Sequence, residues 1–138
     1  MTDYVDLCEP IKMSSKMYSY IEEKVVELFI NLNITSFPIK PRQIAKKLGI
    51  KTKTYKKLGE ELRNKLIKNE VYGFTYENKK SNVCIIAYEG TASNKRTRFT
   101  IMHEIGHYVL KHKEPSALAE KMADYFAGYA LAPTPLMS

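Results

Sequence analysis

The 138-residue chain is predicted to form one α+β domain, residues 1–138, that is mostly helical with a small antiparallel β-hairpin. Apolar residues make up 44% of the chain, and over most of its length they recur at helical spacing. Between about residues 71 and 88 they instead form short β-branched and aromatic runs, which are typical of strands. The length suits a single domain, and no repeat or low-complexity linker marks a boundary.

The N-terminal part, about residues 14–69, is predicted to contain three helices. Ser14 and Ser15 offer an N-cap to the first helix, which should run for about five turns. The second is short, begins with Pro41 and is closed by Gly49. The third covers the sequence LGEELRNKLIKN, in which leucines recur along one stripe. We expect all three helices to precede any strand.

The C-terminal part is predicted to contain the hairpin and two longer helices. The runs VYGFTYE and NVCIIAY, about residues 71–88, flank the turn-like sequence ENKKSN. Helices should then cover about residues 94–112 and 116–131. Because proline restricts the residue before it, Pro115 and Pro133 are expected to end them.

Composition narrows the class of protein. No run of about 18 apolar residues and no secretory leader is recognisable, so we expect a cytoplasmic protein without membrane association. Cys8 and Cys84 form no CxxC pattern, which predicts free thiols. The net charge is +7, and residues 40–68 alone hold eleven basic residues against two acidic ones. Such a patch can attract nucleic acid or an acidic protein, or it can be a lysine-rich face exposed to solvent. Because the chain has no recognition motif for nucleic acid, direct nucleic-acid binding is not expected.

The sequence HEIGH, residues 103–107, is an HExxH motif on the first of the two longer helices. Residues four apart on an α-helix project from one face about 6 Å apart along the axis, so His103 and His107 can bind one metal ion. Glu104 lies beside these ligands, where its carboxylate can take a proton from a water molecule. Gly106 costs about 1 kcal/mol in mid-helix relative to Ala, which indicates a close neighbour.

A catalytic zinc ion needs a third protein ligand and an open position for water. The last predicted helix offers Glu120 as this ligand, and Asp124, one turn later, can accept the free N–H of a ligating imidazole. Glu114 is an alternative third ligand. His112 is five residues after His107, which on a continuous helix places it on another side. We therefore interpret it as a C-terminal helix residue that interacts favourably with the macrodipole.

These motifs together resemble a known family. RTRFTIMHEIGHYVLKH followed by EKMADYFAGYALAP is similar to the ImmA/IrrE family of zinc metallopeptidases, and the similarity covers about residues 37–135. The resemblance implies a zincin-like, gluzincin-like fold with Zn²⁺ as the cofactor. By this resemblance, His103, His107 and Glu120 are the three zinc ligands and Glu104 is the general base. Asp124 falls at a position where the family often has Asn or Asp.

The resemblance also implies a substrate, because family members typically act on helix-turn-helix repressors of the Xre type. We therefore predict a zinc-dependent endopeptidase, a hydrolase in which Glu104 takes the water proton and later protonates the leaving amine. The alternative is a zinc-containing binding module that relieves a repressor by contact without proteolysis. Tyr88, Tyr108, Tyr125 and Tyr129 are candidate oxyanion donors. A substrate segment can add as a strand to the edge of the Val83–Tyr88 hairpin.

Overall fold

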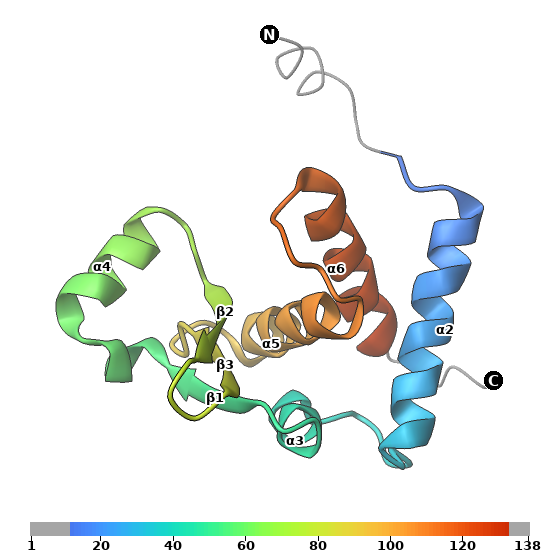
Figure 1. Ribbon diagram of the computed structural model, residues 1–138, viewed down its shortest axis with the longest axis horizontal. Coiled ribbons are helices and arrows are strands. Elements are labelled where there is room, and N and C mark those ends of the chain that lie inside the picture. Colours follow the sequence, from blue (N-terminus) through green and yellow to red (C-terminus); the bar gives the residue numbers. More distant parts are fainter. Residues whose placement is uncertain (1–11, 133–138) are drawn as a thin grey trace, which may run out of the picture.

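The computed structural model describes residues 12–132, which form five α-helices, one short 3₁₀ helix and a three-stranded sheet, so the predicted α+β class is confirmed (Figure 1). Within this part of the chain, no helix has the length and hydropathy needed to cross a bilayer. In chain order the elements are α2 (Ser15–Asn31), α3 (Pro41–Lys47), β1 (Lys51–Thr54), η1 (Tyr55–Leu58), α4 (Glu60–Lys68), β2 (Gly73–Asn78), β3 (Val83–Tyr88), α5 (Asn94–Val109) and α6 (Ala117–Ala130).

Local signals in the sequence set the beginnings of four of the helices. The hydroxyl of Ser14 accepts a hydrogen bond from the backbone N–H three residues later and so caps α2. Ser93 and Ser116 cap α5 and α6 in the same way. Pro41 occupies the first turn of α3, where its missing N–H costs nothing. The helices predicted from Ser14 and Pro41 are confirmed, as are the two helices predicted to begin near residues 94 and 116.

The sheet has the order β1-β3-β2, with β3 in the centre. Residues 73–78 of β2 pair antiparallel with residues 83–88 of β3, which confirms the hairpin. β1 pairs with β3 in parallel, so the sheet is mixed. The expectation that three helices precede any strand is wrong, because β1 lies between α3 and α4. Its sequence, KTKT, has no apolar residue that would mark a strand, and its strand conformation depends on pairing with β3.

One hydrophobic core joins α2, α3, β3, α5 and α6. Helix α5 contacts β2 and β3, α6 packs across α5, and α2 packs against α6 (Figure 1). Ile86 of β3, Ile105 of α5 and Phe126 of α6 are fully buried. The helix that carries the HExxH motif therefore lies in the middle of the molecule, with its position fixed from several sides.

The segment between β1 and β2 projects from the sheet, and α4 lies at the opposite end of the molecule from α2 (Figure 1). Tyr55 in η1 is fully buried, and its hydroxyl donates a hydrogen bond of 2.8 Å to the carbonyl oxygen of Val71. This bond ties the two ends of the segment together. Helix α4 buries none of its residues, and Leu62 of the predicted leucine stripe is 44% exposed.

Candidate metal centre

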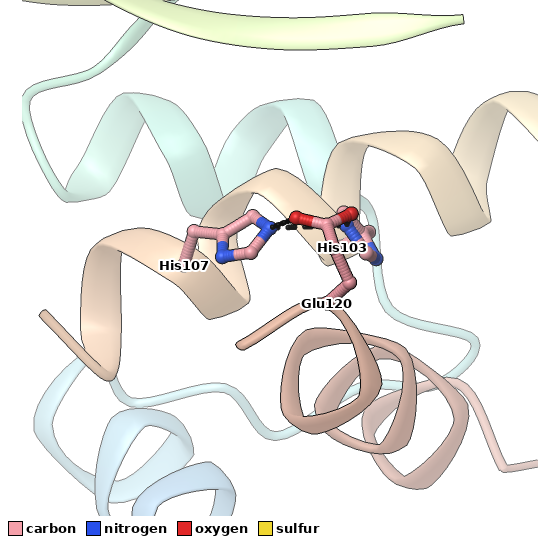
Figure 2. A group of neighbouring side chains, drawn as sticks. All are labelled: His103, His107 and Glu120. Carbon is pink, nitrogen blue, oxygen red and sulfur yellow. Dashed lines mark hydrogen bonds and ion pairs between the residues drawn. The ribbon is translucent and has the colours of Figure 1, made fainter. Parts of the chain in front are cut away.

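Two neighbouring helices bring two imidazoles and one carboxylate together (Figure 2). His103 and His107 project from one face of α5, and Glu120 reaches them from the first turn of α6. Oε1 of Glu120 lies 3.1 Å from Nε2 of His103, and its Oε2 lies 2.8 Å from Nε2 of His107. The two Nε2 atoms are 3.1 Å apart. The structure thus brings together the three residues that the sequence analysis proposed as ligands.

The chemistry of this donor set fits zinc. Two imidazole nitrogens and one carboxylate oxygen form a His₂Glu set, which is typical of catalytic zinc sites. With zinc bonds of about 2.0–2.1 Å, the edges of a coordination tetrahedron measure about 3.3 Å, close to the separations of 2.8–3.1 Å between the donor atoms. The His103 and His107 side chains are 13% and 18% exposed, whereas that of Glu120 is 56% exposed. The group is therefore open to solvent on the side of Glu120.

Gly106 allows α6 to approach α5. A Cβ atom at this position would lie 3.1 Å from both Cγ and Cδ1 of Phe126, nearer than the 3.5–4.0 Å of about optimal carbon contacts. The close neighbour predicted for Gly106 is therefore the fully buried ring of Phe126, six residues after Glu120 on α6. This contact sets how near the carboxylate of Glu120 lies to the histidines of α5.

Asp124 follows Glu120 by one turn of α6, and its Oδ1 lies 2.8 Å from Nδ1 of His103. Because Nε2 of this imidazole faces the ligand group, Nδ1 carries the proton when Nε2 binds a metal, and Asp124 accepts it in a hydrogen bond. Glu114, the alternative third ligand, is exposed in the connection between α5 and α6. It does not belong to the ligand group found among residues 12–132.

Glu104 is the only charged side chain that is buried in the described part of the chain, at 7% exposure. Its Oε1 accepts a hydrogen bond of 2.7 Å from the hydroxyl of Thr75 on β2. Sequence reasoning missed Thr75. The available signal was the alternation along β2, where Gly73 and Thr75 interleave with the aromatic Phe74 and Tyr76 and so share the other face of the strand.

Two cavities meet at the candidate metal centre, and both are lined by Gly73, Glu104 and Glu120. The larger, of about 1070 Å³, extends toward the beginning of α5 and includes Tyr72, whose ring lies 4.2 Å from the guanidinium carbon of Arg96. The smaller, of about 290 Å³, extends to the connection between α5 and α6. A Cβ atom at Gly73 would overlap with Cγ2 of Thr100 on α5, so the glycine lets β2 run directly beside the site.

The four tyrosines considered as oxyanion donors do not line either cavity, as far as the chain is described. Tyr125 donates a hydrogen bond of 2.5 Å to Glu22 of α2, and this bond, with burial and the charge of Glu22, raises the pKa of Tyr125 to about 12. Tyr129 stacks on Tyr125, and Tyr88 is buried in the sheet. Tyr72, by contrast, lines the larger cavity.

His112 lies against His107, so its predicted position on another side of α5 is wrong. The prediction continued the helix to residue 112, but α5 ends at Val109 and Lys111 adopts a left-handed conformation with φ 59°. The chain therefore turns back, and Nδ1 of His112 lies 2.9 Å from Nδ1 of His107. Burial of the imidazole, with the neighbouring His107, lowers the pKa of His112.

Comparison with known proteins adds a match to one family. Residues 45–138, more than half of the chain, match the model of the IrrE N-terminal-like domain, which is a peptidase family. The chain belongs to this family. No curated protein and no solved structure matches it. The expected family is thereby confirmed, and its membership identifies the chain as a peptidase.

The part that matches the IrrE N-terminal-like domain begins within α3 and contains the whole sheet, α5 and α6. Every residue of the candidate metal centre lies in it. Helix α2 precedes the matched residues and packs against α6 from outside.

Proposed function

We propose that the chain is a zinc-dependent endopeptidase that hydrolyses a peptide bond in a protein substrate, and that the substrate is an Xre-type helix-turn-helix repressor. The observation that carries the proposal is that two glutamates near the histidines have different positions relative to the donor set. Glu120 belongs to a converging His₂Glu donor set, whereas the neighbouring Glu104 is buried outside that set. A purely structural zinc site would be closed by a fourth ligand and would have no use for such a carboxylate.

The proposed holders of the ion are His103, His107 and Glu120, with Asp124 orienting the first imidazole. A zinc ion bound there would act as a Lewis acid: it would polarise the scissile carbonyl and make the attacking water more acidic. Glu104 accepts the proton of the attacking water and then delivers it to the leaving amine. A carboxylate has about four acceptor sites, so the hydrogen bond from Thr75 orients Glu104 and leaves it able to take that proton.

The shape of the site supports an extended peptide as the substrate. β2 is an edge strand, so its outer backbone groups are not used by the sheet. Both cavities are lined by Glu104 and Glu120, and both touch β2 at Gly73. A peptide that adds to β2 as a further strand, by main-chain hydrogen bonds, would cross the metal centre. The choice of an Xre-type repressor rests on the family resemblance in the sequence.

The test uses Glu104→Gln, which removes the proton acceptor and is nearly isosteric. Zinc content measured by mass spectrometry should stay near one per chain, because Glu104 is outside the donor set, whereas His103→Ala should lose the metal. Repressor cleavage, followed by intact mass, should fall by about 10²–10⁴-fold in Glu104→Gln. Glu23→Gln, which makes the same change at an exposed position on α2, is the matched control and should cleave normally.

Two results would contradict the proposal. If the wild-type chain took up no zinc after supplementation, the metal centre would be wrong. If Glu104→Gln relieved repression in cells as well as the wild type does, contact with the repressor rather than hydrolysis would be the function.

A further inference from the structure

The contact between His112 and His107 is outside the donor set and has no part in the chemistry described so far. The two Nδ1 atoms are 2.9 Å apart, and the ring planes are inclined by 68°. The contact is therefore made through ring nitrogens and is not a stack. We propose that His112 is a positioning residue for metal binding: its Nδ1 accepts the Nδ1–H of His107 and so fixes the orientation and tautomer of that ligand.

The backbone makes this contact a defined feature of the fold. The N–H of His112 bonds to the carbonyl oxygen of His107 at 3.0 Å, and the N–H of Lys111 bonds to that of Tyr108 at 3.2 Å. With Lys111 left-handed, these two bonds form a Schellman motif at the end of α5. In this motif the second residue after the C-cap contacts the third residue before the C-cap. Here these two residues are His112 and His107.

The tautomers follow from the direction of the rings. His107 presents Nε2 to Glu120 and to His103, so Nε2 is the atom that offers a lone pair to the metal. Its proton is then on Nδ1, which must donate. His112 offers Nδ1 at hydrogen-bond distance, and this atom accepts when the His112 proton is on Nε2.

The two ligating imidazoles are thus supported in different ways. His103 donates its Nδ1–H to the carboxylate of Asp124, whereas His107 donates to a neutral ring. Partners that accept the free N–H of a ligating histidine typically contribute 10–100-fold to metal affinity, because they hold the ring in its binding orientation. We expect a contribution in this range from His112.

The experiment measures the zinc dissociation constant by competition with a chelator, and it rests only on the metal-binding part of the proposed function. His112→Leu keeps a similar volume and removes the acceptor, so affinity should fall by about 10–100-fold. His112→Asn places an amide oxygen near the position of Nδ1 and should keep most of the wild-type zinc affinity. Lys111→Gly, which favours the same left-handed turn, is the matched control and should keep the wild-type affinity. Melting of the metal-free variants checks that the fold is intact.

A spectroscopic measurement separates positioning from packing. In the zinc-loaded wild type and in His112→Asn, nitrogen-15 NMR should show His107 with its proton on Nδ1 in a hydrogen bond, and this signal should be lost in His112→Leu. If His112→Leu binds zinc as tightly as the wild type, or if Leu and Asn weaken binding equally, the inference is overturned. A wild-type chain that binds no zinc would instead refute the proposed function itself.

Discussion

The replacement Gly106→Ala tests the contact that sets the spacing between α5 and α6. The added Cβ would meet three atoms of Phe126 at 3.1, 3.1 and 3.2 Å. Since Phe126 is fully buried, its ring cannot move into solvent, and the helices must separate by a few tenths of an ångström. Overpacking of this kind typically costs about 1–3 kcal/mol. Alanine recovers about 1 kcal/mol of helix propensity, which leaves a net loss of about 0–2 kcal/mol.

Gly128→Ala is the matched control on α6. Apart from the nearby backbone of α6 itself, no atom lies within 4 Å of a Cβ built at this position, so the alanine should stabilise the protein by up to about 1 kcal/mol through helix propensity. Urea unfolding of both metal-free variants gives the comparison. Gly106→Ala should also bind zinc more weakly, since the separation moves Glu120 away from the histidines. Equal stability of the two variants would refute the view that a side chain at position 106 would force α5 and α6 apart.

Two further predictions concern groups with shifted pKa values. The hydrogen bond to Glu22 raises the pKa of Tyr125 to about 12, above its ordinary value of 10.0, so this bond stabilises the fold below pH 10 and is lost as the pH rises toward 12. Tyr125→Phe should therefore lower the unfolding free energy by about 1 kcal/mol at pH 8, with a difference that shrinks above pH 10; a difference unchanged up to pH 12 would contradict this. Burial, with the charge of Glu77, raises the pKa of the Cys84 thiol, so iodoacetamide at pH 8 should alkylate Cys84 more slowly in the folded than in the unfolded chain. The alkylated protein should keep its zinc, and release of metal would place this thiol near the centre.

The parts of the site that follow from local geometry could be predicted from the sequence. The spacing of His103 and His107 within one helix is enough to place both imidazoles on one face, and the serine caps fix where α5 and α6 begin. A helix-to-helix contact such as that of Glu120 could be proposed because the connection between α5 and α6 is short.

Cys8, predicted to be a free thiol, lies outside the described residues.

The parts that were missed depend on contacts between distant residues or on an unmarked change of backbone. The alternation along β2 places Thr75 on one face of the strand, but it does not specify the register of β2 against α5 that brings this hydroxyl to Glu104. The left-handed residue after α5 is Lys111, where glycine would have given the usual signal, so the turn that carries His112 back was not recognised.

The strand order has a consequence for synthesis of the chain on the ribosome. β1 emerges before β2, yet its partner β3 comes last, with Lys51 paired to Ile85. While the intervening residues are made, β1 has no neighbour and exposes its backbone hydrogen-bonding groups. An apolar strand in this position would invite pairing with other chains. The alternating lysines and threonines of residues 51–54 disfavour such pairing, both before β3 is made and at the finished edge of the sheet.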